Sequence, residues 1–67
     1  MFERIKALRN ESNLSQNEIA KALNISRSAY GNYERGARSF TLDVLWRIAD
    51  YYNTSLDYLF NRTEDRF

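Results

Sequence analysis

The stretch LSQNEIAKALNISRSAYGNYERG, residues 14–36, decides the fold. Near its start, Ser15 is followed three residues later by Glu18, which is the spacing of a capping box. In that motif the Ser hydroxyl accepts a hydrogen bond from the Glu amide, and the Glu carboxylate accepts one from the Ser amide. The apolar-periodic segment that follows closes at Asn24, a residue type that tolerates the left-handed conformation just past a helix. These signals predict a helix over residues 16–23.

The second half of the stretch repeats the same order of signals. Ser26 is a capping residue, and Gly36 is a favourable residue for the position just past a helix end. They predict a helix over residues 27–35, which Asn24, Ile25 and Ser26 join to the preceding helix. Two short helices connected by a three-residue turn form a helix-turn-helix motif, here over about residues 16–35.

The same signals recur outside this motif. Asn13 and Asn53 also close apolar segments and are followed within two residues by Ser, and Thr41 can cap a further helix. Pro is absent and Gly occurs only at positions 31 and 36, so strong helix breakers are rare. We therefore expect an all-α fold, a compact five-helix bundle with helices over roughly 2–12, 16–23, 27–35, 42–52 and 56–61.

Apolar residues at helical spacing predict the core. Phe2, Ile5 and Leu8 share one face of the first helix. The fourth helix carries a broader apolar stripe that we expect to be buried, formed by Leu42, Leu45, Trp46, Ile48, Ala49 and Tyr52. We assign the aromatic residues Trp46, Tyr52 and Phe60 to packing rather than to ligand binding. We expect residues 1–67 to form a single domain, with a tail, 62–67, that frays or makes a contact outside the monomer.

The composition excludes several classes of protein. The chain has 67 residues, a mass of 8.0 kDa, and neither Cys nor His. It can form no internal disulfide, and we expect no metal site and no cofactor. With 43% hydrophobic and 28% charged residues, it is typical of a globular protein rather than of a disordered segment or a membrane span. The start of the chain lacks the pattern of a secretory signal, so we expect a cytoplasmic protein without a membrane partner.

The sequence resembles the phage-repressor or Cro-like helix-turn-helix family (XRE type), whose domains are lambda-repressor-like. The resemblance runs from about Ile5 to Phe60 and is carried by four blocks, namely Leu14 to Ala20, Leu23 to Ser28, Tyr33 to Gly36, and Ser55 to Phe60. It implies a five-helix domain whose third helix lies in the DNA major groove, usually as a homodimer on a two-fold operator. This sequence departs from the family in having Asn at three turns that often carry Gly, and Gly31 inside the recognition helix.

Four residues of the helix over 27–35 are our candidates for contact with base edges, namely Arg27, Ser28, Gly31 and Asn32. The N-terminus of this helix enters the groove in the helix-turn-helix motif. Arg can bind O6 and N7 of guanine, and Asn can bind N6 and N7 of adenine. Gly31 costs about 1 kcal/mol of helix stability relative to Ala. Either it lets the helix backbone approach a base or a thymine methyl, or it reflects drift at a tolerant site.

Phosphate contacts are expected from Gln16, Lys21, Arg35 and Arg38, which flank the candidate reading surface. Gln16 begins a helix whose free amides and dipole favour an anion, and the resemblance places its counterpart against a backbone phosphate. The resemblance also implies that Glu34 pairs with a basic residue of the first helix, and Arg9 is at the matching position. We expect this structural ion pair to tie the first helix to the end of the third.

The net charge of +1 conceals an uneven distribution. Residues 1–20 are neutral, residues 21–47 carry five basic and two acidic residues (+3), and residues 48–67 carry two basic and four acidic ones (−2). The positive part contains the candidate DNA-binding helix. The negative part contains the expected homodimer interface, for which we name Tyr51, Leu56, Tyr58, Asn61 and Phe67.

Two functions are compatible with these residues, and a third is not. A sequence-specific double-stranded DNA-binding regulator, most simply a repressor acting by occupancy of its operator, agrees best with the motif. The alternative is a protein-interaction module such as an antitoxin, which would bind a partner through Tyr51, Tyr58, Phe60 and Phe67. An enzyme is not expected, because the sequence contains no phosphate loop, nucleophile elbow or inward carboxylate pair.

Overall fold

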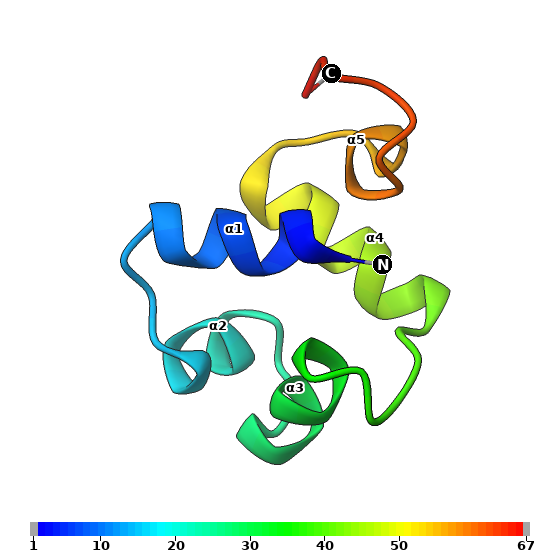
Figure 1. Ribbon diagram of the computed structural model, residues 1–67. Helices are drawn as coiled ribbons and strands as arrows, with labels where there is room; N and C mark the ends of the chain where they lie inside the picture. Colours follow the sequence, from blue (N-terminus) through cyan, green and yellow to red (C-terminus); the bar gives the residue numbers. More distant parts are fainter. Residues whose placement is uncertain (1, 67) are drawn as a thin grey trace.

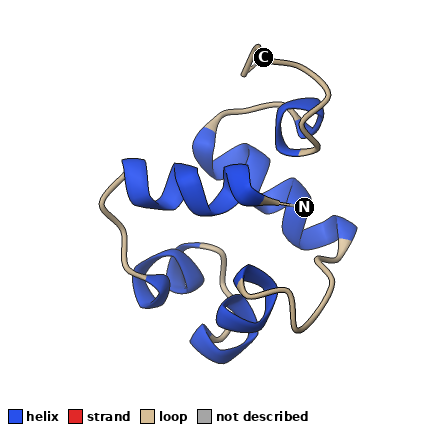
Figure 2. Cartoon of the chain, in the orientation of Figure 1, coloured by secondary structure: helices blue, strands red, loops and turns tan. Residues whose placement is uncertain are grey.

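The computed structural model describes residues 2–66, and within them it contains five helices and no strand (Figure 1, Figure 2). The helices are α1 (Glu3–Glu11), α2 (Gln16–Ala22), α3 (Arg27–Glu34), α4 (Leu42–Tyr52) and α5 (Leu56–Leu59). The all-α, five-helix prediction is confirmed, and every helix end lies within two residues of its expected position. In Figure 1, α2 and α3 lie on one side of α1 and α5 lies on the other. None of these helices, in the part of the chain that is described, is long and apolar enough to cross a membrane.

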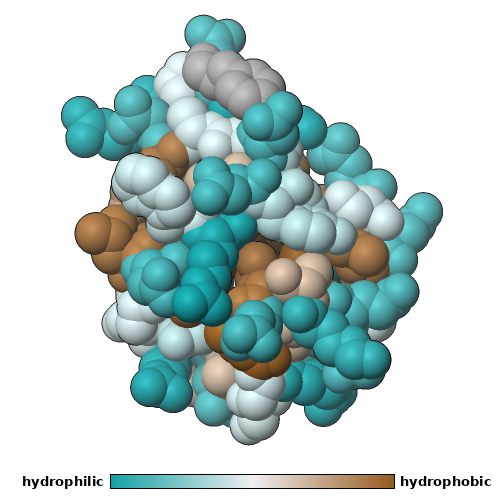
Figure 3. Space-filling view, turned by 180° about the vertical axis from the view of Figure 1, so that it is seen from behind, coloured by the Kyte–Doolittle hydropathy of each residue, from teal (hydrophilic) through white to brown (hydrophobic). Residues whose placement is uncertain are grey.

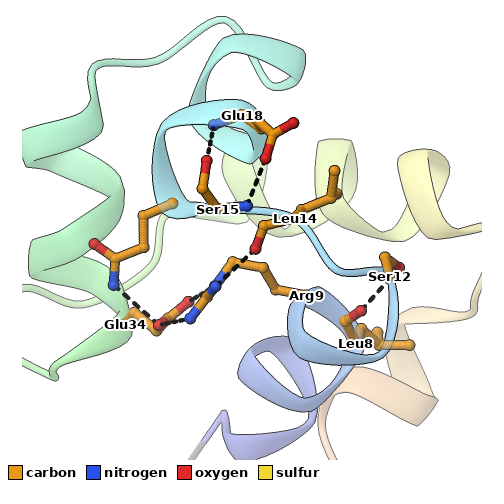
Figure 4. A network of polar contacts seen from close by, with 8 residues as sticks. Leu8, Arg9, Ser12, Leu14, Ser15, Glu18 and Glu34 are labelled. Carbon is orange, nitrogen blue, oxygen red and sulfur yellow. Dashed lines mark hydrogen bonds and ion pairs between the residues drawn. The ribbon is translucent and has the colours of Figure 1, made fainter.

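Side-chain caps begin four of the helices. In the capping box of α2, the Glu18 amide donates to Ser15 Oγ (3.1 Å) and the Ser15 amide donates to Glu18 Oε1 (2.9 Å), as Figure 4 shows. Ser26, Thr41 and Ser55 accept backbone hydrogen bonds in the same way at the starts of α3, α4 and α5. Left-handed residues mark the predicted turns, namely Asn13, Asn24 and Asn53 with φ of 58°, 60° and 57°, and Gly36 with φ of 79°.

One hydrophobic core receives side chains from all five helices. Its buried residues are Ile5, Leu8, Ile19, Ala20, Leu23, Tyr30, Tyr33, Val44, Leu45, Ile48, Ala49 and Leu59. At its edge, the Phe40 ring stacks on Tyr33 with the ring centroids 4.9 Å apart, and Phe2 meets Phe40 edge-on at 5.1 Å. These aromatic contacts anchor the loop after α3 to the start of α1, so the C-terminal end of α3 has a fixed position.

The expectation that the whole apolar stripe of α4 is buried is wrong. Leu42 and Trp46 are 65% and 58% exposed, and Phe60, also assigned to packing, is 41% exposed. The side of α4 that faces the core includes Val44 and Ile48. A buried face needs an apolar arc of only about 100° around a helix. The apolar stripe of α4 is wider than that arc, so its margins, Leu42 and Trp46, are exposed. Figure 3 shows the molecule from behind, where hydrophobic surface (brown) forms separate patches between hydrophilic residues.

The C-terminal tail, for which the sequence predicts fraying or a contact outside the monomer, contacts the rest of the domain up to residue 66. The Arg4 guanidinium donates to the carbonyl of Thr63 and forms an ion pair with Glu64 at 2.9 Å. Arg66 forms an ion pair with Glu11 of α1, also at 2.9 Å, and its carbonyl accepts from the Ser55 amide. The tail therefore returns to α1 and the start of α5. The contacts with α1 could not be predicted from the polar sequence of the tail, because the partners in α1 are 55 to 60 residues away in the chain.

A largely buried ion pair joins α1 to α3, and the expected contact between Arg9 and Glu34 is present (Figure 4). Arg9 Nε and Nη2 donate to the two carboxylate oxygens of Glu34, each at 2.8 Å, which is the bidentate geometry of strong charge-assisted hydrogen bonds. Arg9 Nη1 also donates to the carbonyl of Leu14 at 2.8 Å. The two side chains are only 13% and 6% exposed. The pair therefore holds α1, the turn before α2 and the end of α3 together.

The environment of Glu34 lowers the pKa of its carboxyl. Burial by itself raises that pKa, because it disfavours the charged form, but hydrogen bonds from Arg9 and Gln16 favour the carboxylate and outweigh burial. The hydrogen bond to Glu34 correspondingly raises the pKa of Arg9, with burial opposing it. Both groups are therefore charged at neutral pH, and each depends on the other to be buried in that form.

Removal of the charge on Glu34 is expected to destabilise the fold strongly. Glu34→Gln keeps the size of the side chain but leaves the Arg9 charge without its partner, and breaking a buried pair in this way costs about 3–5 kcal/mol. We expect a large fall in the midpoint of thermal unfolding at neutral pH, followed by circular dichroism. The matched control is Glu11→Gln in the exposed pair with Arg66, which should hardly change the midpoint. A midpoint for Glu34→Gln equal to that of the wild type would refute a stabilising role for the pair.

The same pair predicts a specific loss of stability in acid. Because the pKa of Glu34 is lowered in the folded state, its contribution is complete above the unfolded value of about 4.3 and is lost as the pH falls through the folded value. Unfolding midpoints measured between about pH 6 and pH 2.5 should therefore decline more steeply for the wild type than for Glu34→Gln. The difference between the two curves isolates Glu34 from the other carboxyl groups. Parallel curves would show that Glu34 does not have a lowered pKa.

Candidate nucleic-acid interface

The exposed face of α3 collects the residues predicted to read DNA. Arg27, Gly31 and Arg35 follow one another at intervals of four residues, and Ser28 and Asn32 form a parallel row, so the five lie on one side of the helix. Together with Gln16 of α2, these residues line a shallow surface hollow of about 250 Å³. The structure thus brings together the four candidate base contacts and two of the four candidate phosphate contacts.

The opposite face of α3 explains why this face is exposed. Tyr30 is fully buried and Tyr33 is 7% exposed, so both rings belong to the core. Their spacing of three residues places them on one side of the helix, and Ser26 fixes where the helix begins. α2 packs against α3 through Ile19 and Ala20, which are also buried. Rotation of α3 about its axis would expose two tyrosines, so the outward direction of the reading residues follows from core packing.

Gln16 is held by the ion pair beneath it. Its Nε2 atom donates to Glu34 Oε1 at 3.1 Å, so Gln16 joins the network of Arg9 and Glu34. An amide group carries two N–H donors, and this contact uses one of them. The second N–H of Gln16 remains available to a phosphate at the start of α2. The sequence analysis did not anticipate the link to Glu34, since the two residues are 18 positions apart.

Asn32 and Arg35 contact each other in the free protein. Arg35 Nη2 donates to Asn32 Oδ1, which orients the amide of Asn32. The Nδ2 donor of Asn32 then has no partner within residues 2–66. Asn32 is half-buried, whereas Arg27, Ser28 and Arg35 are exposed. The side chains of Asn32 and Arg35 are thus oriented relative to each other before any ligand binds.

The cations of this region are not neutralised by the protein itself. Arg4, Arg9, Arg47 and Arg66 each form an ion pair with a carboxylate. Among residues 2–66 the remaining cations have no such partner, and they are Lys6, Lys21, Arg27, Arg35, Arg38 and Arg62. Four of these six cations lie in α2, in α3 or in the loop that follows α3, namely Lys21, Arg27, Arg35 and Arg38. The acidic residues therefore neutralise cations elsewhere and leave the helix-turn-helix side positive.

Lys6 is a basic residue of this side that the sequence analysis did not name. It lines a cleft of about 600 Å³ between the start of α1 and the loop after α3, and Arg35 and Arg38 line the same cleft. The Arg38 guanidinium lies over the Tyr33 ring, 5.8 Å from its centroid. Lys21 lies apart from these residues, exposed on α2. Lys6 precedes Arg9 by one helical turn, and that spacing could have indicated that it faces the end of α3.

The residues expected at a dimer interface are only partly available at the surface. Tyr51 is 47% exposed and Asn61 is exposed, whereas Leu56 and Tyr58 are half-buried. Arg4 lies over the Tyr58 ring at 4.2 Å and Arg66 approaches the same ring at 5.6 Å. Phe67, the fifth expected residue, lies outside the described residues. Trp46, which was assigned to the core, instead lines a shallow hollow of about 300 Å³ together with Thr54 and Leu56.

Known proteins match this chain along most of its length. A family model described as helix-turn-helix matches residues 5–59. The chain is 37% identical over 62 residues to the HTH-type transcriptional regulator ImmR of Bacillus subtilis, covering 92% of this chain and 49% of ImmR. It is 37% identical over 62 residues to the control protein C.SmaI of Serratia marcescens, covering 92% and 74% of the two chains. It is 30% identical over 61 residues to the cryptic phage CTXphi transcriptional repressor RstR of Vibrio cholerae, covering 91% and 55%.

The chain thus spans about half the length of ImmR and RstR, and most of the length of C.SmaI. No solved structure matches it. The family match runs from α1 to α5 and includes the whole segment from α2 to α3 that carries the candidate reading residues. These matches agree with the five-helix fold and with the blocks of sequence that indicated the family. The chain therefore belongs to the helix-turn-helix family of XRE type.

Proposed function

We propose that this protein is a sequence-specific double-stranded DNA-binding transcriptional regulator, and that it acts in the cytoplasm as a repressor by occupying its operator. The observation that carries the proposal is the distribution of unpaired cations. Lys21, Arg27, Arg35 and Arg38 have no carboxylate partner in the described chain and lie on the helix-turn-helix side, where a polyanion would neutralise them. The printed names of ImmR and RstR, a transcriptional regulator and a transcriptional repressor, support the same function.

In this proposal α3 lies in the major groove with its N-terminal residues toward the bases. Arg27 binds a guanine through O6 and N7, and Asn32, one turn further along, binds a base through its amide. Gln16, Arg35 and Arg38 contact phosphates around this helix and fix its register, since phosphate contacts position a protein without reading sequence. Lys6 and Lys21 add positive charge at the margins.

The protein binds as a homodimer in this proposal, because one short helix contacting one half-site binds weakly. Two copies related by a two-fold axis would read half-sites about 34–36 Å apart, one turn of the DNA helix. We place the interface around α5, with Tyr51, Leu56 and Asn61, and extend it to Trp46, whose exposed ring lies beside Leu56. Apart from Trp46, this surface belongs to the acidic segment of the chain, residues 48–67, which electrostatics keeps away from DNA.

A second candidate function is a protein-interaction module such as an antitoxin. The exposed rings of Tyr51 and Phe60, which are 47% and 41% exposed, favour it. Aromatic side chains are enriched where proteins bind one another. The two functions differ in their electrostatics, because only a DNA-binding protein releases counterions from the phosphate backbone when it binds.

Binding measurements with two arginine variants test the roles in DNA reading. Arg27→Ala is expected to lower the affinity for the preferred sequence about 5- to 150-fold, since a bidentate contact with guanine contributes about 1–3 kcal/mol. Arg38→Ala should weaken binding to all sequences alike and reduce the slope of log affinity against log salt by about 0.9. Both are measured by fluorescence anisotropy, between about 50 and 200 mM salt, on a duplex selected from a random-sequence pool.

The control for these variants is Arg62→Ala. Arg62 is exposed and lies in the tail after α5. In Figure 1, α5 lies on the other side of α1 from α3. Its loss should change neither the affinity nor the salt slope. Equal effects of Arg62→Ala and Arg27→Ala would overturn the placement of α3 in the groove. A flat salt response of the wild type would favour the protein-interaction function instead.

Sedimentation equilibrium tests the homodimer. A charge at position 46 would be buried without a partner in the proposed interface, so Trp46→Glu should give a monomer at concentrations at which the wild type is a dimer. Because Trp46 is 58% exposed in the single chain, the variant should still fold and keep the circular dichroism spectrum of a helical protein. Asn10→Glu, which adds the same charge at an exposed position of α1, should remain dimeric. A wild type that is monomeric both with and without its DNA would contradict the proposed pairing.

A further inference from the structure

Gly31 is a feature of α3 that the interior of the protein does not explain. It lies inside the helix, where its backbone has no left-handed conformation to accommodate. A Cβ added to Gly31 would have one near neighbour within the described structure, Gln16 Oε1 at 3.4 Å, which is an ordinary van der Waals contact. Alanine would therefore fit, and it would favour the helix. The packing of the protein therefore does not require a glycine at this position, and Gly31 borders the side of α3 that is open to a ligand.

Gly31, which has no side chain, lines the surface hollow on that side, which we call the Gly31 hollow. Gly31 lies midway in the row that Arg27 begins and Arg35 ends, so a gap separates two long cationic side chains. The hollow measures about 250 Å³, well above the volume of about 30 Å³ that one water molecule takes up in the liquid. Its rim carries hydrogen-bond donors from Arg27, Asn32 and Gln16, whereas Gly31 itself presents only backbone.

The major groove offers one apolar group that suits such a gap. In that groove every base edge presents polar groups, which are hydrogen-bond donors and acceptors. Thymine also presents an apolar group, the methyl group on C5, and 5-methylcytosine carries the same group. Donors at the rim can bind the acceptors of neighbouring bases, but a methyl group needs space without a polar partner. The absent side chain of Gly31 leaves room for a methyl group between the Arg27 and Arg35 side chains, with Gln16 Oε1 at the edge of that room.

We infer that the Gly31 hollow receives the 5-methyl group of a pyrimidine, so that the protein distinguishes thymine from uracil, and 5-methylcytosine from cytosine, at one position in each half-site. The inference rests on the proposed function, because it requires α3 to lie in the major groove. A phosphate in the hollow is the competing occupant, since Arg27 and Arg35 flank it. If a phosphate occupied the hollow, the affinity would not depend on the methyl groups of the bases. Measurement of that dependence therefore distinguishes a phosphate from a methyl group as the occupant.

The test begins with a duplex selected from a random-sequence pool. Each thymine of a half-site is replaced in turn by uracil and each cytosine by 5-methylcytosine, and the affinity of the wild type is measured by fluorescence anisotropy. Burial of one methyl group corresponds to roughly a fourfold change in affinity. We expect that change at one pyrimidine position of each half-site, as a loss on removal of a methyl or as a gain on its addition. Equal affinities at every position would overturn the inference.

The variant Gly31→Ala provides the second arm, because its side chain places a methyl group of its own in the gap between Arg27 and Arg35. At the same pyrimidine position the variant should lose or reverse the preference for a methylated base, while its response elsewhere is unchanged. The matched control is Ala22→Gly, which replaces alanine by glycine at an exposed residue of α2. This variant should keep the preference of the wild type for the methylated pyrimidine. A wild-type preference retained by Gly31→Ala would contradict the role of the hollow.

A failure of DNA binding and a failure of the methyl contact give different experimental results. A pool that yields no enriched sequence would contradict the proposed function and, with it, the reading of a methyl group. An enriched sequence whose affinity falls with salt, but which is bound equally well with uracil and with thymine, would leave DNA binding intact and exclude the methyl contact. Gly31→Ala is not expected to fail to fold, since alanine adds stability inside a helix.

Discussion

The arrangement of the helices depends on one buried carboxylate. Glu34, at the end of α3, accepts two hydrogen bonds from Arg9 of α1 and one from Gln16 of α2, while Arg9 also donates to the carbonyl of Leu14 in the intervening turn. Apolar packing has little directional preference, whereas bidentate charge-assisted bonds specify both distance and orientation. In a chain with a core this small, such a connection sets how the N-terminus of α2 and the exposed row of α3 lie relative to each other.

Selective pairing of charges decides which part of the protein is positive, although the net charge is only +1. Four arginines are neutralised by carboxylates in pairs that join α1 to α3, α1 to the tail, or successive turns of α4. The basic residues of α2, α3 and the following loop are left without such partners in the described chain. A protein of this kind has a weak field at long range and a strong one close to a single face. In the proposed complex with DNA, non-specific attraction would then be small, and contacts with the bases would determine a larger share of the binding free energy.

Local signals were sufficient to predict most of the fold. The capping box at Ser15 and the left-handed Asn24 act within a few residues, so their effect is visible in the sequence alone. Exposure of Trp46 was missed because it depends on which arc of α4 other helices cover. The return of the tail to Arg4, and the link from Gln16 to Glu34, join residues far apart in the chain, and no pattern of spacing encodes those distances. The pairing of Arg9 with Glu34 was expected only through resemblance to a family.

The separation of the exposed row of α3 from the core has a consequence for how such a domain can evolve. Arg27 and Ser28 contribute nothing to the core, and the tyrosines that anchor the same helix point the other way. Mutations at these two positions can therefore accumulate with little effect on folding, whereas changes at Tyr30 or Glu34 would be eliminated. New operator preferences can arise by drift on an unchanged scaffold, and duplicated copies can diverge until each controls its own set of genes.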